Sequence, residues 1–401
     1  MKRQRILTIV GTRPEAIKLA PVIRRLQEHP HVHHTLALSG QHAALAHGAL
    51  RSFGLQHDVD LELMQENQSL SVLAARTLAA FEELYRARRP DWVLVQGDTT
   101  TAFAGALAAF YQQIRVAHVE AGLRTYNATN PFPEEINRRF IAQLAALHFA
   151  PTARAEKNLL REGISADRIF VTGNTGIDAL HEMAQRAGPL PPAIARAQAN
   201  GWRMLLVTAH RRESFGRPLA RICAAVRSIV DGHRDVFAVY SLHPNPNVSG
   251  PVRELLGNTD RIFLVDAAGY DAFVPLMKAS HVILTDSGGI QEEAPALGKP
   301  VIVLRATTER REGLASGGAI MGGTNPRRIA QTIQWLLENE HAYRRMARIR
   351  SPYGDGQAAA RIVEILTGPH RTIGLPRSTF PLAHASPRAA GRTPRRDADS
   401  A

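Results

Sequence analysis

Short apolar runs recur along the chain, each followed by a turn and a stretch with helix-like spacing. Strands that are apolar throughout and alternate with helices are typical of parallel sheets covered on both faces. Eleven such strands exceed one usual doubly wound sheet, so we predict two sheets, of six and five strands. The first six are residues 5–10, 35–39, 91–95, 114–119, 147–150 and 169–172, and the other five are 204–209, 236–242, 261–265, 281–285 and 301–304.

This pattern predicts an α/β fold with two Rossmann-like, doubly wound domains that face a cleft. We place the first domain at residues 1–170 and the second at 175–356, with the boundary near the segment 171–178. Residues 357–367 are expected to form a helix that packs back on the first domain. Residues 368–401 are rich in Pro, Arg, Ala and Ser without apolar periodicity, which predicts a disordered basic tail.

Composition narrows the class of protein. The 401 residues are 44% hydrophobic and 21% charged, which is ordinary for a globular protein. The single cysteine, Cys223, excludes a disulfide framework and a cysteine-rich metal cluster, and we expect it to be buried and inert. The start of the chain fails as a signal peptide, and no apolar run approaches the roughly 18 residues of a membrane span. We therefore expect a cytoplasmic protein without a membrane partner.

The formal charge of +13 invites a nucleic-acid interpretation. Residues 2–5 contribute +3 and residues 368–401 contribute +4, so only about half of the excess lies in the body of the chain. That body lacks a dense basic run with interleaved aromatic residues. A polyanionic small ligand is favoured over DNA or RNA.

Unusual polar residues follow the predicted strands. Asp98, Glu120, His210, His243 and the segment 286–289 each come directly after a buried strand. Ligands bind outside the carboxyl ends of the strands in open parallel sheets, so these positions mark a candidate site.

Two segments suit a nucleotide without matching the usual nucleotide motifs. Residues 11–18, GTRPEAIK, place Arg13 and Lys18 near a helix start, but lack both the G-x-G-x-x-G of a dinucleotide site and the P-loop pattern. Ser287, Gly288 and Gly289 open a helix whose backbone N–H groups suit an anion, and Glu293 on that helix suits a ribose diol. The alternative for 286–289 is a tight turn with no ligand.

Asp98, Glu120 and Glu134 suggest proton transfer beside a departing phosphate. Each also has a structural alternative: Asp98 as a helix cap, Glu120 as a partner of Arg124, and Glu134 as a first-turn residue that faces the helix dipole. The histidine-rich stretch 28–34 lacks grouped carboxylates, so we expect no metal site there.

Together these segments resemble the non-hydrolysing UDP-N-acetylglucosamine 2-epimerase family. The resemblance runs in order over about residues 5–366, through GTRPEAIKLAPVI, QGDTTTAFAGALAA, AHVEAGLRT, NPFPEEINRR, VTGNTGIDAL, TAHRRESFG, HPNPNV, ILTDSGGIQEEAPALGKPVIVLRATTER and SPYGDGQAA. It implies a cytoplasmic homodimer with the glycosyltransferase-B type of fold. It also implies interconversion of UDP-GlcNAc and UDP-ManNAc without a metal or another cofactor.

The resemblance also implies residue roles, carried over by motif. The catalytic set would be Asp98, Glu120, Glu134 and His210. The substrate contacts would be Arg13, Lys18, Phe273, Ser287, Gly288, Gly289, Glu293 and Arg310. A possible regulatory site for a second UDP-GlcNAc would comprise Gln41, Glu135, Arg211 and His243.

The implied chemistry is elimination of UDP to give 2-acetamidoglucal, followed by readdition with C2 inverted. Two other activities stay open. A hydrolysing epimerase would release ManNAc and UDP, although the Pro and Lys of GTRPEAIK favour the non-hydrolysing branch. A glycosyltransferase of the same architecture would not need the three acids.

Overall fold

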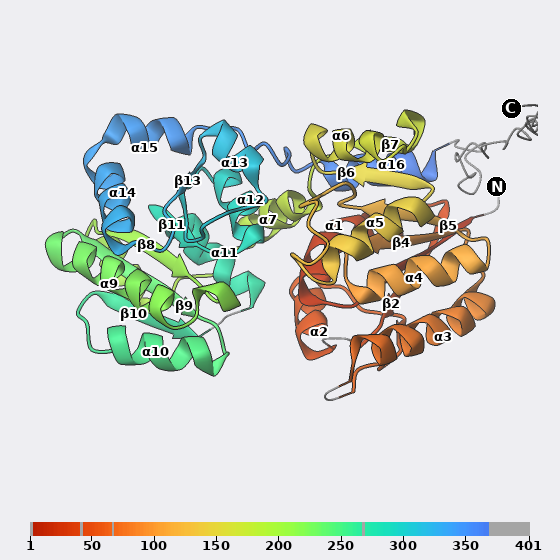
Figure 1. The fold of residues 1–401 in the computed structure, drawn as a ribbon, viewed down its shortest axis with the longest axis horizontal. Helices are drawn as coiled ribbons and strands as arrows, with labels where there is room; N and C mark the ends of the chain where they lie inside the picture. Colours follow the sequence, from red (N-terminus) through yellow and green to blue (C-terminus); the bar gives the residue numbers. More distant parts are fainter. Residues whose placement is uncertain (1–2, 41–42, 66–67, 267–268, 369–401) are drawn as a thin grey trace, which may run out of the picture.

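Two parallel sheets, each in its own lobe, organise the chain (Figure 1). The structure is a computed structural model that describes residues 3–40, 43–65, 68–266 and 269–368. The expected α/β fold with two doubly wound sheets is confirmed, but the strand count of six and five was too low. The sheets have seven and six strands, because two edge strands of two and three residues are too short to form an apolar run.

The first sheet has the strand order β3-β2-β1-β4-β5-β6-β7. Its strands are β1 (Gln4–Val10), β2 (Val32–Leu38), β3 (Val59–Asp60), β4 (Trp92–Gln96), β5 (Arg115–Val119), β6 (Leu147–Ala150) and β7 (Ile169–Val171). The helices of this lobe are α1 (Arg13–Glu28), α2 (Ala43–Ser52), α3 (Leu70–Arg88), α4 (Thr100–Tyr111), α5 (Glu134–Leu144) and α6 (Ala153–Arg161).

The second sheet has the order β10-β9-β8-β11-β12-β13. Its strands are β8 (Arg203–Thr208), β9 (Val236–Leu242), β10 (Ile262–Asp266), β11 (Val282–Thr285), β12 (Val301–Val303) and β13 (Ala319–Met321). Its helices are α8 (Pro192–Ala199), α9 (Arg217–Gly232), α10 (Pro246–Leu256), α11 (Tyr270–Ala279), α12 (Gly288–Ala296), α13 (Arg311–Ser316), α14 (Pro326–Glu338) and α15 (Glu340–Ala347).

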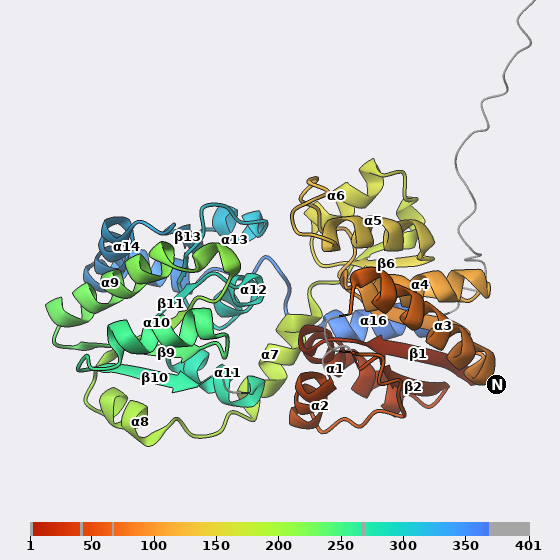
Figure 2. The same cartoon turned by 60° about the horizontal axis from the view of Figure 1, so that its bottom comes forward.

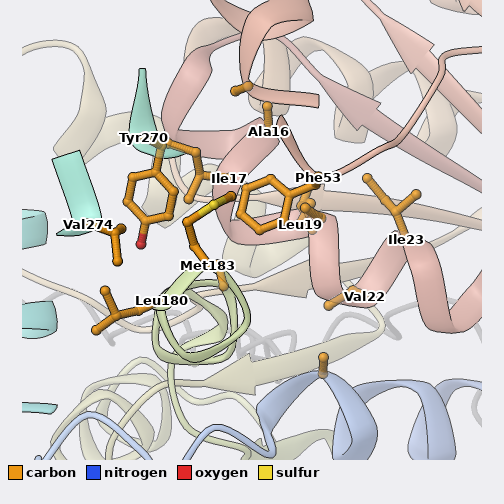
Figure 3. Close-up of a cluster of buried hydrophobic side chains, with 14 of the residues drawn as sticks. Ala16, Ile17, Leu19, Val22, Ile23, Phe53, Leu180, Met183, Tyr270 and Val274 are labelled. Atoms are coloured by element: carbon orange, nitrogen blue, oxygen red, sulfur yellow. The ribbon is translucent and has the colours of Figure 1, made fainter. Parts of the chain in front are cut away.

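Helix α7 (Thr175–Gln185) lies between the lobes and packs on helices of both, α1 on one side and α11 and α12 on the other (Figure 2). Figure 3 shows Leu180 and Met183 of this helix among Phe53, Tyr270 and Val274. All five side chains belong to one buried apolar cluster. The two lobes therefore share a core at this end rather than meeting only through a linker.

The last described helix, α16 (Ala358–Thr367), returns to the first lobe and packs on α1 and α7. Asp178 of α7 accepts hydrogen bonds from the backbone N–H groups of Ala358 (3.2 Å) and Ala359 (2.8 Å). A buried carboxylate thus satisfies donors at the start of α16 that have no partner within the helix. No described helix is long and apolar enough to cross a membrane.

The strand orders fix where a ligand fits. In each sheet the order reverses between two central strands, β1 and β4 in the first and β8 and β11 in the second. Ligands of open parallel sheets bind beyond the carboxyl ends of the strands at this reversal. Arg13 follows β1 and Asp98 follows β4, whereas His210 follows β8 and Asp286 follows β11. The polar motifs therefore lie at the reversal point of each sheet.

Candidate active site

Asp98 lies in the turn between β4 and α4 and forms an ion pair with Arg138 of α5. The neighbouring Thr99, not Asp98, caps α4, because its side chain accepts from the Ala102 N–H at 3.1 Å. Asn137 donates to the Asp98 backbone carbonyl at 3.0 Å, which fixes the turn. Two residues of α5 thus hold Asp98, and the helix-cap alternative is wrong.

Glu120 follows β5 and adopts φ of +64°, a left-handed conformation that is uncommon outside glycine. Its carboxylate is paired with Lys18 of α1 and also accepts from the Gln96 amide. The alternative partner, Arg124, instead binds Glu162 through two hydrogen bonds of 2.8 and 2.7 Å. Such backbone strain persists where the surroundings enforce it, and it clusters at functional sites.

The neighbouring charges decide how Glu120 and Lys18 are ionised. Burial by itself raises the pKa of Glu120, but Lys18, with smaller contributions from Arg310 and Arg138, outweighs burial and leaves this pKa below its ordinary value. Burial likewise lowers the pKa of Lys18, yet Glu120 and Glu292 together raise that pKa above its ordinary value. Glu120 is therefore a carboxylate and Lys18 an ammonium at neutral pH. The backbone just before Asp98 lies close by, since a Cβ built on Gly97 would be 3.8 Å from a Glu120 carboxylate oxygen.

A chain of polar contacts continues from the first lobe into the second. Lys18 Nζ lies 3.9 Å from the Glu292 carboxylate of α12. Asn174 bridges the same two acids, donating to Glu292 at 2.9 Å and to Glu120 at 3.4 Å. Arg310 Nε then donates to Glu292 at 2.8 Å. The carboxylates of the first sheet and the cations of the second therefore belong to one network.

Glu134 and Glu135 begin α5 but have different roles. Glu134 is half-buried, and its side chain has no hydrogen bond or ion pair with any described residue, so it is open to a ligand. Its expected place in the first helical turn is confirmed. Glu135 is fully buried and accepts from the backbone N–H groups of Thr125 and Tyr126, both at 3.0 Å. Glu135 therefore holds the loop after Glu120, and its contact with a regulatory ligand stays a prediction.

In the second lobe, Asp286 organises the segment after β8. One of its oxygens, Oδ2, accepts from the N–H groups of His210 and Arg211 at 2.9 Å and from the Ser214 hydroxyl at 2.8 Å. The other oxygen, Oδ1, is buried and lies 3.7 Å from His210 Nδ1. The Asp286 side chain thus holds in place His210, predicted to be catalytic, and Arg211, predicted to be regulatory.

His210 stacks on His243, with ring centroids 5.0 Å apart and an interplanar angle of 13°. Burial lowers the pKa of His210, and His243 and Arg211 add to this effect against the opposing charge of Asp286. His210 is therefore largely neutral at pH 7 and can both donate and accept a hydrogen bond. Of the predicted regulatory residues, Gln41 lies outside the described residues, whereas Arg211 and His243 adjoin His210.

Helix α12 begins with Gly288 after Ser287, as predicted for an anion site. A Cβ on Gly288 would lie 3.0 Å from the Arg310 guanidinium carbon, so a side chain here would displace the cation. No neighbour lies within 4 Å of a Cβ built on Gly289, so the space beside it is open. Arg310 is held by Glu292 and by Glu309, whose carboxylate lies 2.6 Å from Nη1. This places a fixed positive charge next to the helix N-terminus.

Glu293 is buried on α12 and differs from Glu120 in its ionisation. Burial and the nearby charge of Glu292 raise the pKa of Glu293 to about 8, while Lys18, Tyr270 and Arg13 only partly oppose this. Glu293 therefore carries a proton at pH 7 and can donate as well as accept. Phe273, one turn after Tyr270 on α11, is half-buried against the shared core, and no described contact joins it to the ionic network.

Comparison with known proteins fits this geometry. A sequence profile described as UDP-N-acetylglucosamine 2-epimerase matches residues 24–367. The UDP-N-acetylglucosamine 2-epimerase of Bacillus subtilis (strain 168) is 46% identical over 366 residues, which are 91% of this chain and 96% of that protein. The enzyme of the same name from Escherichia coli (strain K12) is 45% identical over 368 residues, 90% of this chain and 98% of that protein.

The chain belongs to the UDP-N-acetylglucosamine 2-epimerase family.

Solved structures of the family agree. The UDP-GlcNAc 2-epimerase of Neisseria meningitidis bound to UDP-GlcNAc is 43% identical, with a TM-score of 0.84 over 90% of this chain and 99% of that one. The enzyme of Methanocaldococcus jannaschii in complex with UDP-GlcNAc and UDP is 33% identical, with a TM-score of 0.77 over 91% of this chain and 99% of that one. The resemblance inferred from the motifs is confirmed, and so is the fold class.

Several residues of the network were not assigned a role from sequence. Arg138, Asn174 and Asp286 stand inside family motifs, and Glu292 precedes the predicted Glu293, but their partners lie far away along the chain. Strand-end position was the signal for Asp286. For Glu292 and Asn174 the motifs did not indicate the partners, because these residues join the two lobes.

Two expectations away from the network have clear outcomes. Cys223 is buried on α9, and burial raises the pKa of its thiol to about 12, so it is the unreactive thiol form at neutral pH. Within the stretch 28–34, His34 is bonded to the Thr8 hydroxyl at 2.9 Å. Among the described residues, the group with metal-ligand geometry is His47, His57 and Asp60, outside the ionic network.

Proposed function

We propose that this protein interconverts UDP-N-acetylglucosamine and UDP-N-acetylmannosamine by inverting C2. The observation that carries the proposal is the network that joins Glu120 and Lys18 of the first lobe to Glu292 and Arg310 of the second, with Asp98 held by Arg138 at the end of a neighbouring strand. Proton carriers and anion-binding cations in one site are what loss of UDP coupled to deprotonation requires. Family membership supplies the substrate.

The reaction begins with departure of UDP. Direct removal of the C2 proton is costly because that position is a poor acid. As the C1–O bond to UDP breaks, positive charge develops at C1 and acidifies C2–H. A carboxylate then takes the proton, which leaves 2-acetamidoglucal and bound UDP. Return of a proton to the opposite face and readdition of UDP at C1 gives the epimer.

The carboxylates serve the two faces of C2, and His210 completes the catalytic set. Glu120 is ionised and positioned as a base, since Lys18 holds its pKa low. Glu134, with no partner among the described side chains, is available to exchange a proton with the sugar or with water. Two faces of one carbon need proton carriers on two sides, which accounts for more than one acid in the site.

The cations stabilise the leaving group. Negative charge grows on the diphosphate as UDP departs, and Arg310 and the N–H groups at Ser287, Gly288 and Gly289 face that charge. Arg13 and Lys18 are assigned to the diphosphate and sugar, Phe273 to the uracil, and Glu293 to the ribose. We assign no metal and no nicotinamide to the reaction.

One assay separates this reaction from its nearest rivals. Incubation with UDP-GlcNAc alone, followed by chromatography, should yield UDP-ManNAc at equilibrium with its substrate. Stoichiometric free ManNAc with UDP would instead identify a hydrolysing enzyme. Transfer of the sugar to an acceptor with C2 unchanged would identify a glycosyltransferase.

We also propose that the protein is a homodimer. Large apolar side chains are exposed on helices that pack together in the first lobe: Leu70 and Val72 on α3, Phe110 and Tyr111 on α4, and Phe140 on α5. Large apolar side chains left exposed on the helices of one lobe are candidates for an interface. Light scattering coupled to size exclusion should give twice the chain mass of 43.9 kDa, and a Tyr111→Glu variant should shift it toward the monomer.

Regulation by a second UDP-GlcNAc is proposed at the residues next to His210. Arg211 is anchored by Asp286 and His243 is exposed and stacked on His210, so a ligand at this position would contact the catalytic histidine directly. We expect activation to be weakened, because Ala44 and Asn67 stand where regulated members have polar or basic side chains. If UDP-ManNAc alone is inert until traces of UDP-GlcNAc are added, this expectation is wrong.

A further inference from the structure

The first lobe contains two groups of histidines with opposite geometry. His29 and His31 are two positions apart in sequence, yet their rings are 6.0 Å apart, edge to face, and no carboxylate of the described part of the chain forms a metal-binding group with them. His47 and His57 are ten residues apart, and their rings are stacked 4.8 Å apart with an interplanar angle of 2°. Asp60 lies against this second pair, with its carboxylate 2.8 Å from His47 Nε2.

We propose that His47, His57 and Asp60 form a binding site for a late first-row divalent cation such as Zn²⁺. One nitrogen from each histidine and one oxygen from Asp60 all lie within 4.8 Å of one another. Tetrahedral zinc with bonds near 2.0–2.1 Å holds neighbouring ligand atoms about 3.3 Å apart. The His47–Asp60 distance is already shorter than this, so the cation would replace the proton that these two groups share.

The three proposed ligands differ in how firmly the fold holds them. Asp60 is on β3, which pairs with β2, and its second oxygen accepts from the Glu62 N–H at 3.1 Å. His47 is on α2 and partly buried, whereas His57 is exposed in the connection before β3. Two ligands are thus fixed by secondary structure. The exposed third, His57, must turn out of its stacked orientation to complete the shell, because two parallel rings do not both direct a nitrogen at one cation.

Donor chemistry selects the class of cation. Two imidazoles and one carboxylate favour Zn²⁺, Ni²⁺ or Cu²⁺ over Mg²⁺ and Ca²⁺, which prefer all-oxygen shells. Water would fill the remaining positions because His57 faces solvent. The site lies outside the ionic network of the reaction, so the cation takes no part in the chemistry at C2.

A bound cation would tie α2 to β3 and fix the connection between them. That connection carries Phe53, whose ring stacks on Tyr270 of the second lobe with centroids 6.1 Å apart. The Phe53 carbonyl also accepts from Arg24 of α1. Metal binding would therefore restrain the segment through which the first lobe contacts α11.

The test uses the untagged full-length protein, stripped with chelator and titrated with ZnCl₂ in equilibrium dialysis. We expect one Zn²⁺ per chain. His57→Ala, an exposed position where folding is not at risk, should weaken binding roughly tenfold or more, and His47→Ala should do the same. The matched control is the doubly substituted His29→Ala/His31→Ala, which removes two histidines from the same lobe and should bind like wild type.

A second readout localises the effect. In hydrogen exchange with mass spectrometry, ZnCl₂ should slow exchange in peptides from residues 43–60 of the wild type and not of His57→Ala. The proposal is overturned if the wild type binds no stoichiometric Zn²⁺ at millimolar concentration, or if His57→Ala and His47→Ala bind it as tightly as wild type. Equal loss of binding in the His29/His31 control would also overturn it.

Discussion

The two lobes contribute to the site in opposite ways. In the Asp98–Arg138 pair of the first lobe the acid faces the site and the cation anchors it, with side chains 26% and 9% exposed, whereas Glu120 and Lys18 of the same lobe are both mostly buried, at 8% and 14%. In the second lobe the carboxylate is the anchor, since Asp286 is fully buried while His210 is 32% exposed. Glu292 and Arg310 repeat this arrangement at 4% and 16%.

This difference predicts a division of labour. The acids of the first lobe, Asp98, Glu120 and Glu134, are suited to moving protons. In the second lobe, Arg310 and the N-terminus of α12 are suited to holding a diphosphate, together with Arg13 and Lys18 of α1. Substitutions of the acids should therefore act on turnover, and substitutions of the cations on binding of UDP.

The largest effect is expected from the acids. Asp98→Asn, Glu120→Gln and Glu134→Gln keep shape but remove the proton carrier, so each should reduce kcat by about 10²-fold or more with little change in UDP affinity. Steady-state kinetics and calorimetry with UDP measure the two quantities. Glu364→Gln, an exposed amide substitution on α16, is the control. Near-normal turnover in all three variants would refute the assignment of proton transfer to the acids of the first lobe.

A smaller effect is expected from the cation. Arg310→Lys keeps the charge but cannot contact Glu292, Glu309 and a phosphate together, so UDP should bind about tenfold more weakly. Inhibition of the reaction by UDP measures this. Arg311→Lys, at the exposed neighbouring position, should bind UDP normally. Unchanged UDP affinity in the Arg310 variant, with a large loss of kcat instead, would reverse the assignment of the second lobe.

The smallest effect concerns Glu293. Its pKa of about 8 exceeds the 4.5 of an ordinary carboxyl, so between these pH values the folded state holds a proton that the unfolded state has released. Stability should therefore fall as pH rises from about 5 to 8. Glu293→Gln has no proton to lose and should become more stable relative to wild type over this range, by about 1–3 kcal/mol.

Thermal unfolding of both proteins at pH 5.5 and 8.0 checks this. A constant difference in Tm between wild type and Glu293→Gln at the two pH values would show that Glu293 is ionised, as Glu120 is, and would remove one contrast between the lobes.

The sequence predicted what depends on local pattern. Buried strands, the polar residue after each strand and the helix that opens at Gly288 all follow from short stretches of chain. The strands β3 and β13 were not predicted, because edge strands this short show no hydrophobic periodicity.

Pairings across the fold could not be predicted. Nothing near Glu120 in sequence indicates that Lys18 rather than Arg124 neutralises it, or that Glu292 and Asn174 join this pair from beyond the first sheet. The histidines show the same limit: the conspicuous run at 28–34 does not converge, whereas His47 and His57 do so because the chain after α2 folds back and brings Asp60 to His47. These contacts depend on topology, which sequence spacing does not encode.

The central claim is that C2 loses its proton while UDP is detached, and isotope exchange tests it most directly. The proton carriers exchange with water when product leaves, so in D₂O without added cofactor UDP-ManNAc should carry deuterium at C2, and prolonged incubation should label the UDP-GlcNAc pool as well. NMR after many turnovers measures both. UDP-ManNAc formed with an unlabelled C2 would contradict the account.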